Sequence, residues 1–269
     1  MCDLAGEQGL TEFVFAGDGV RLAFERMGEG KPVLLIHGFG SSAQQNWKST
    51  GWYGSLTAAG FAVVAMDCRG HGLSDKPHDP AFYGHDRMAE DAATVMAAAD
   101  LPSAAVVGYS MGGFIALRLA AAHPARVSRL ALCGVGEFYL RGPRIANPQA
   151  RSSLAEALLT DDKAGITDKR GRMFRDFADQ PGKDRFALAA CMQAMSQGLP
   201  IEALAQLQQP VLVVCGALDD IAGAPGPLAA AFRFGHAVTI PGRDHMSAVG
   251  ERKTRQAVLD ELMAAPQDS

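Results

Sequence analysis

The sequence predicts an α/β protein whose parallel strands are covered by helices on both faces. Six short segments are rich in Val, Leu and Ile, and continuous apolar runs of this length suit buried parallel strands. These segments are Pro32–His37, Phe61–Asp67, Ala104–Tyr109, Ser128–Cys133, Pro210–Gly216 and Ala237–Ile240. Helical patterns lie between several of them, and this alternation is typical of a doubly wound sheet.

The remaining elements of the predicted core follow from local patterns. Thr11–Phe15 and Val20–Arg26 flank the turn Gly17-Asp18-Gly19, which predicts an antiparallel hairpin ahead of the parallel strands. Apolar periodicity predicts four helices, at Asp86–Ala99, Met111–Ala122, Pro227–Phe234 and Arg252–Ala264.

The alternation stops between Gly136 and Ala205, a stretch of 70 residues with helical patterns and no convincing strand. We interpret this stretch as a helical lid inserted after the sixth strand. The prediction is an α/β core formed by residues 1–135 and 206–269, with a helical cap at residues 136–205. The length of 269 residues suits one large α/β domain with an insertion.

The composition indicates a globular protein whose partner is neither nucleic acid nor membrane. Apolar residues make up 48% of the chain, and the formal net charge of -4 gives no field that attracts phosphate backbones or anionic lipid. No apolar run approaches the ~20 residues of a membrane span, and Met1–Gly9 lacks the pattern of a signal peptide. The five cysteines contain no C-x-x-C pair and are interpreted as reduced thiols, so we expect a cytoplasmic protein.

The strongest functional motif is Gly108-Tyr109-Ser110-Met111-Gly112-Gly113, which follows an apolar strand and precedes an apolar helix. This is the context that a nucleophile elbow needs, because glycines allow the sharp turn that exposes a serine hydroxyl. The dipole of the following helix also points at that hydroxyl. Ser110 is therefore the candidate nucleophile.

A serine hydroxyl needs a base, and the base needs an acid that orients it. His245 follows the last predicted strand and is the candidate base, while Asp219 follows the strand before it and is the candidate acid. Asp220 and Glu137 remain alternatives for the acid, because both also lie just beyond predicted strands.

The motif His37-Gly38-Phe39-Gly40 follows the first parallel strand, where one oxyanion donor is expected. The backbone N–H groups of Phe39 and Met111 are the candidate donors, since both would converge beside Ser110.

With these motifs, the sequence resembles an α/β-hydrolase-fold serine hydrolase, and the resemblance covers nearly the whole chain outside the lid. It includes Asp67-Cys68-Arg69-Gly70-His71-Gly72-Leu73-Ser74, which is similar to a family segment with a mainly structural role. The resemblance implies a mostly parallel sheet of eight strands, no cofactor and ester-type substrates.

The subfamilies of this fold differ in residues that the sequence shows. Members that open epoxides or remove halides use Asp as the nucleophile, and Ser110 argues against both activities. Hydrolases of C–C bonds usually carry Trp after the base, where this chain has Met246, and an Arg in the lid, where it has seven between Arg141 and Arg185. We therefore expect a small carboxylic ester or lactone as substrate. A C–C bond hydrolase of diketone-type ring-fission products and a non-turnover ligand receptor are the alternatives.

Three further patterns have ordinary explanations. The segment Lys163–Arg175 holds five basic residues against Asp168, which is typical of a solvated face. His78-Asp79 and His85-Asp86 lack the spacing of a metal site, so we expect a surface loop and no metal. Six apolar lid residues are candidates for an acyl pocket or for the lid core: Phe138, Phe174, Phe177, Phe186, Met192 and Met195.

Overall fold

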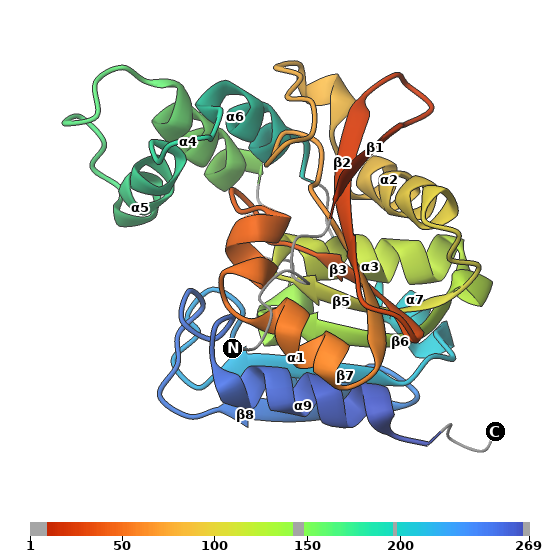
Figure 1. Ribbon diagram of the computed structural model, residues 1–269. Coiled ribbons are helices and arrows are strands. Elements are labelled where there is room, and N and C mark those ends of the chain that lie inside the picture. The colour runs from red at the N-terminus through yellow and green to blue at the C-terminus, as the bar shows by residue number, and fades with distance from the viewer. Residues whose placement is uncertain (1–9, 142–147, 196–197, 266–269) are drawn as a thin grey trace, which may run out of the picture.

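The computed structural model describes residues 10–141, 148–195 and 198–265. Its single sheet of eight strands has the order β1-β2-β4-β3-β5-β6-β7-β8 (Figure 1). The strands are β1 (Thr11–Phe15), β2 (Arg21–Met27), β3 (Lys31–Ile36), β4 (Phe61–Met66), β5 (Ala104–Tyr109), β6 (Val127–Cys133), β7 (Val211–Gly216) and β8 (Gly235–Ile240). Only the pairings β1 with β2 and β2 with β4 are antiparallel. The predicted fold class is thus confirmed.

The helices lie on both faces of this sheet. They are α1 (Trp52–Ala58), α2 (His85–Ala98), α3 (Met111–Ala122), α4 (Pro148–Leu159), α5 (Lys169–Ala178), α6 (Arg185–Ala194), α7 (Ile201–Gln206), α8 (Pro225–Ala229) and α9 (Arg252–Met263). Strand β3 shows the two layers, because its side chains alternate between faces. Leu34 and Ile36 pack with residues of α2 and α3, whereas Val33 and Leu35 pack with residues of α1 and α9. No described helix is both long and apolar enough to cross a bilayer.

Two helices differ from the prediction. Helix α8 ends at Ala229, five residues earlier than the predicted Phe234, because β8 already starts at Gly235. A Cβ at Gly235 would lie 2.0 Å from the carbonyl oxygen of Ala229, so the chain turns closely here. Helix α1 was not predicted, because its buried face holds only Trp52, Tyr53 and Leu56, too few residues to show a period.

The segment between β6 and β7 contains the group of helices α4, α5 and α6, which stands to one side of the sheet at the upper left of Figure 1. We call these three helices the lid helices. Their buried side chains form a small cluster of their own: Leu154, Ala155, Leu158, Ala178, Leu188, Ala189 and Met192. Helix α7 instead buries Leu204 in the main core. The division of the chain at residues 136 and 205 stays a prediction.

The segment Asp67–Ser74 ties loops of the core together through a buried arginine. Arg69 is 1% exposed and contacts the Asp91 carboxylate through two N–O distances of 2.6 Å. It also donates to Asp18 at 2.7 Å. Burial raises the pKa of Asp91, whereas the hydrogen bond from Arg69 lowers the pKa of Asp18 to about 2. The structural role that the resemblance implies for this segment agrees with these contacts.

Arg69→Met is expected to lower the free energy of unfolding by about 3 to 5 kcal/mol, because Asp91 would stay buried without its cation. Urea unfolding of wild type and variant measures this difference. The matched control is Arg87→Met, which removes an exposed pair with Asp18 and is expected to change stability by less than about 1 kcal/mol. Equal losses in the two variants would contradict a structural role specific to Arg69.

Candidate active site

Ser110 occupies a strained turn between β5 and α3. Its backbone has φ 51° and ψ -113°, a conformation that residues other than glycine rarely adopt. The turn is tight because a Cβ at Gly108 would lie 2.3 Å from the carbonyl oxygen of Gly112. A Cβ at Gly112 would in turn lie 2.0 Å from the carbonyl oxygen of Ile36 on β3. The glycines of the motif therefore allow the close packing that holds Ser110 at the end of its strand.

His245 lies between Ser110 and Asp219. Its Nε2 is 3.0 Å from the Ser110 Oγ, and its Nδ1 is 2.9 Å from the Asp219 Oδ2. A carboxylate only accepts hydrogen bonds, so the Nδ1 carries a proton and the Nε2 is free to accept the serine proton. The structure brings together the three side chains that the sequence singled out.

Asp219 is fixed by the backbone that follows it. Its Oδ1 accepts hydrogen bonds from the N–H groups of Ile221 at 3.0 Å and Ala222 at 2.7 Å, and its side chain is fully buried. The two alternative acids lie elsewhere. Asp220 is exposed, and Glu137 pairs with Arg141 at 3.4 Å. Of the three acids, Asp219 is the one that contacts His245.

The loop that carries His245 is held by two further residues. The Tyr109 hydroxyl donates to the carbonyl oxygen of His245 at 2.5 Å, and burial raises the pKa of Tyr109. Asp244 accepts hydrogen bonds from the N–H groups of Met246 at 3.1 Å and Ser247 at 2.8 Å, which closes a turn. Tyr109 was not predicted as a site residue, although its place beside the nucleophile on a buried strand was a signal.

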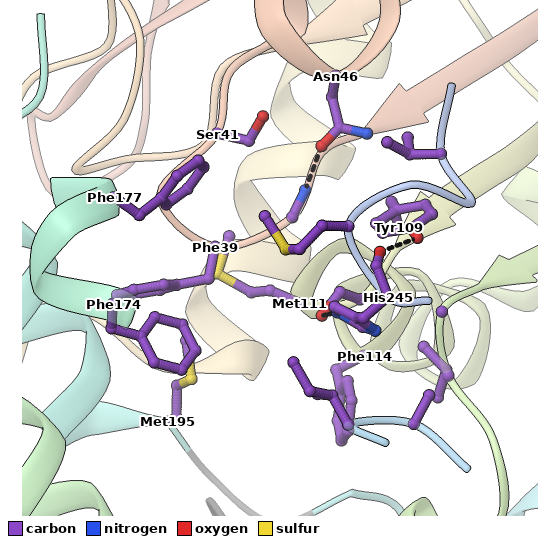
Figure 2. A pocket seen from close by; sticks show the side chains of 18 of the residues that line it. Phe39, Ser41, Asn46, Tyr109, Met111, Phe114, Phe174, Phe177, Met195 and His245 are labelled. Carbon is purple, nitrogen blue, oxygen red and sulfur yellow. Dashed lines mark hydrogen bonds between the residues drawn. The ribbon is translucent and has the colours of Figure 1, made fainter. Parts of the chain in front are cut away.

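The two candidate oxyanion donors lie on the wall of the cavity that contains Ser110. The N–H of Met111 has no acceptor inside its helix, because Met111 is the first residue of α3. The loop of Phe39 is held by Asn46, whose Oδ1 accepts the N–H of Gly38 at 3.2 Å (Figure 2). Sequence reasoning missed Asn46, which is buried and also lines the cavity. The role of the two donors stays a prediction.

The cavity beside Ser110 has a volume of about 340 Å³ and a mainly apolar wall. In Figure 2, Phe174, Phe177 and Met195 lie on one side of the view, and His245 lies on the other side with Tyr109 and Phe114. Phenylalanines and methionines make up much of this wall: Phe39, Phe114, Phe138, Phe174, Phe177, Met111, Met173, Met192, Met195 and Met246. Of the six apolar lid residues singled out from the sequence, only Phe186 does not line the cavity. Phe186 is 44% exposed and packs on His78, with a centroid distance of 5.6 Å.

The basic lid segment Lys163–Arg175 mostly serves the lid itself. Lys163 pairs with Asp176 at 2.8 Å, and Arg172 donates to the carbonyl oxygen of Ile166 at 2.6 Å. Among the basic residues of this segment, Arg170 alone lines the described cavity, and it donates to the carbonyl oxygen of Asp220 at 3.3 Å.

His85 differs from the expectation of a surface loop, which was wrong for this residue. It begins α2, is only 4% exposed and lines the cavity. Its ring stacks on Phe114 with a centroid distance of 5.2 Å. His78 instead lies at the surface and pairs with Asp184 at 2.9 Å. No group of three or more His, Cys, Asp or Glu placed to hold a metal occurs in the part of the chain that the structure describes.

Comparison with known proteins points to the same fold. The family model of the alpha/beta hydrolase fold matches residues 31–151. The 2-hydroxymuconate semialdehyde hydrolase of Pseudomonas sp. (strain CF600) is 39% identical over 118 residues, which cover 43% of this chain and 40% of that protein. The chain spans only 33% to 40% of the length of the first curated relatives that it matches.

Solved structures match along almost the full chain. A hydrolase from Pseudomonas aeruginosa PA01 has a TM-score of 0.77 at 26% identity, covering 97% of this chain and 100% of that one. A thermophilic esterase from Thermogutta terrifontis has a TM-score of 0.74 at 24% identity, covering 95% and 98%. Together with the sheet order described above, these matches show that the chain has the α/β-hydrolase fold.

Proposed function

We propose that this protein is a serine hydrolase that cleaves a small carboxylic ester or lactone through an acyl-enzyme on Ser110. The observation that carries the proposal is the unbroken chain of hydrogen bonds from Ser110 through His245 to Asp219. Such a chain activates a hydroxyl for attack on an acyl carbon.

The acylation step follows from the positions of these atoms. The Ser110 Oγ attacks the carbonyl carbon of the substrate while the Nε2 of His245 takes its proton. Asp219 stabilises the resulting imidazolium through the Nδ1, and the N–H groups of Phe39 and Met111 stabilise the negative oxygen of the tetrahedral intermediate. His245 then gives the proton to the departing alcohol. Water attacks the acyl-enzyme by the reverse sequence, with His245 again as the base.

The lining of the cavity favours a substrate whose acyl group is apolar. Its phenylalanine and methionine side chains offer contact without hydrogen-bond donors, and methionine adapts to differently shaped groups. Small-molecule sites of this kind are usually apolar with a few polar groups near the reacting atoms.

The test is kcat/KM for p-nitrophenyl esters of graded acyl length. We expect a clear optimum, because a cavity of about 340 Å³ is filled only up to a certain chain length. The optimum must vanish in Ser110→Ala. An absence of Ser110-dependent turnover on every ester would contradict the proposal and favour either C–C cleavage or a ligand receptor.

C–C bond hydrolysis is the second candidate function, and Arg170 favours it. A guanidinium on the cavity wall is suited to a substrate that carries a carboxylate. The partial similarity to a 2-hydroxymuconate semialdehyde hydrolase supports the same candidate. Met246, which stands where such hydrolases usually carry Trp, argues against it.

Arg170→Ala is expected to raise KM about tenfold for a substrate with a carboxylate, because a charge-assisted hydrogen bond is lost. KM for a neutral ester of similar shape should change much less. Arg172→Ala is the matched control on the same helix, since its side chain bonds Ile166 and does not line the cavity. Steady-state kinetics on both substrates measures the difference. The same KM in Arg170→Ala and wild type would show that Arg170 does not bind the carboxylate of the substrate.

A further inference from the structure

We propose that lid helix α5 positions the loop that carries an oxyanion donor, and that Phe174 acts as a positioning residue in the reaction. The loop consists of Gly38, Phe39 and Gly40, and we call it the oxyanion loop. The inference rests on the proposed function, because it takes the N–H of Phe39 as one of the two donors.

The first observation is the place of the Phe39 side chain between lid and core. Its ring meets the ring of Phe174 edge to face, with centroids 5.6 Å apart at 72° (Figure 2). On the core side it meets the ring of His71 at 5.7 Å and 79°. Phe39 packs against both the main core cluster and the small lid cluster. The residue that we propose as an oxyanion donor therefore has its side chain packed between the lid and the core.

A second lid residue touches the same loop through its backbone. Gly40 has φ +69°, and a Cβ built there would lie 2.8 Å from the Cε1 of Phe177. The ring of Phe177 thus rests directly on the loop backbone. The Lys183 Nζ lies 3.1 Å from the centroid of that ring, and burial lowers the pKa of Lys183 to about 8. The Phe177 ring is therefore held by its own contacts as well as by the loop.

The core holds the loop at its start. Asn46 accepts the N–H of Gly38 at 3.2 Å, and the carbonyl oxygen of Gly38 accepts the N–H of Ser41 at 3.2 Å. Phe39 and Gly40 lie beyond this anchor and receive the lid contacts. The direction of the Phe39 N–H is thus set from the core at one end and from α5 at the other.

Helix α5 is itself firmly placed within the lid. The Asp168 side chain caps its N-terminus by accepting the N–H of Gly171 at 2.6 Å. Near its other end, Arg175 is buried, pairs with Asp179 at 2.8 Å and donates to the carbonyl oxygen of Ala157 at 3.3 Å. Because these bonds fix α5 within the lid, the position of the lid determines where Phe174 and Phe177 contact the oxyanion loop.

A displacement of the oxyanion loop should affect the stability of the transition state more than the binding of the substrate. An oxyanion donor stabilises the tetrahedral intermediate only when its N–H points at the developing charge, so a small displacement of Phe39 lowers kcat. A loss of apolar wall area would instead raise KM, because it weakens the bound ground state as well. The two effects are separable with an acyl group that is too small to need the wall.

The experiment uses p-nitrophenyl acetate, whose two-carbon acyl group fills little of the cavity. Phe174→Ala is expected to lower kcat about tenfold with little change in KM, a part of the loss seen when an oxyanion donor is removed. Methylboronic acid, which forms a tetrahedral adduct on Ser110 and carries a group as small as the acetyl group, should bind more weakly by the same factor. Phe174→Leu keeps an apolar contact with Phe39 and should recover most of kcat. Phe186→Ala removes a lid phenylalanine outside the cavity and should match wild type.

The outcomes separate this inference from the proposed function. Wild-type kcat and boronate affinity in Phe174→Ala, with thermal melting showing a folded protein, would overturn the positioning role of Phe174. If Phe174→Ala failed to fold, Phe174→Val would take its place, because it removes the ring contact with Phe39 and keeps an apolar side chain, and wild-type kcat and boronate affinity in Phe174→Val would overturn the positioning role. A rise in KM with unchanged kcat would also overturn it, because Phe174 would then be only a part of the wall. An absence of Ser110-dependent turnover in the wild type would contradict the proposed function itself.

Discussion

Ser110→Ala is expected to lower kcat for the preferred ester by about 10⁵-fold or more, the loss typical of removing the nucleophile from such a triad. The change removes one oxygen atom and leaves the hydrogen bonds between His245 and Asp219 in place. The free energy of unfolding should stay near that of wild type, because the strained φ of 51° is equally unfavourable for alanine. Initial rates and thermal melting measure the two quantities.

A second serine of the same cavity provides the control. Ser41 lines the cavity but has no contact with His245, so Ser41→Ala should reduce kcat by less than about tenfold. A fluorophosphonate should label the wild type and Ser41→Ala at Ser110, and it should leave Ser110→Ala unlabelled. Turnover that persists in Ser110→Ala, or a label on another residue, would place the nucleophile elsewhere.

Asp219→Asn is expected to lower kcat by about 10⁴-fold, because the amide favours the tautomer of His245 in which the Nε2 carries the proton. In that tautomer the Nε2 no longer accepts the proton of Ser110. The fold should be retained, since the asparagine oxygen can still accept the N–H groups of Ile221 and Ala222. The measurement is kcat on the preferred ester across the pH range in which wild type is active.

The two acids that the sequence left open serve as matched controls. Asp220→Asn changes an exposed carboxylate next to Asp219, and Glu137→Gln changes a carboxylate paired with Arg141. Both should keep kcat within about twofold, because neither carboxylate contacts His245 and both lie outside the hydrogen-bonded chain from Ser110 to Asp219. A large loss in either control, or a small one in Asp219→Asn, would assign the acid differently.

The sheet was predictable because a strand that is buried on both faces appears in the sequence as a continuous run of apolar residues. The central strands β5 and β7 are buried along their whole length, and both differ from the predicted segments by at most one residue. The approach of Ser110, His245 and Asp219 follows from topology as well. Strand ends of a parallel sheet meet at one edge, so residues far apart in sequence come together there.

The lid contacts were not predictable, because they depend on how separate helices pack. The sequence marks Phe174 and Phe186 alike as apolar lid residues, yet one lines the cavity and the other lies at the surface. His85 shows the same limit. The nearby Pro80 indicates a loop, whereas the buried position of His85 results from the stacking of its ring on Phe114 of α3. Contacts between side chains of separate helices leave no periodic pattern in the sequence, so they could not be predicted from it.

The close packing around Gly108 and Gly112 has a consequence for how this scaffold can change. The restriction falls on the backbone, since any side chain at these two positions would collide with a carbonyl oxygen. The Ser110 side chain, in contrast, faces an open cavity. A library that varies position 110 therefore tests new nucleophiles on an unchanged backbone turn. A library that varies Gly108 or Gly112 disrupts that turn. The side chain at position 110 can therefore be changed, whereas the backbone of the turn tolerates only glycine at positions 108 and 112.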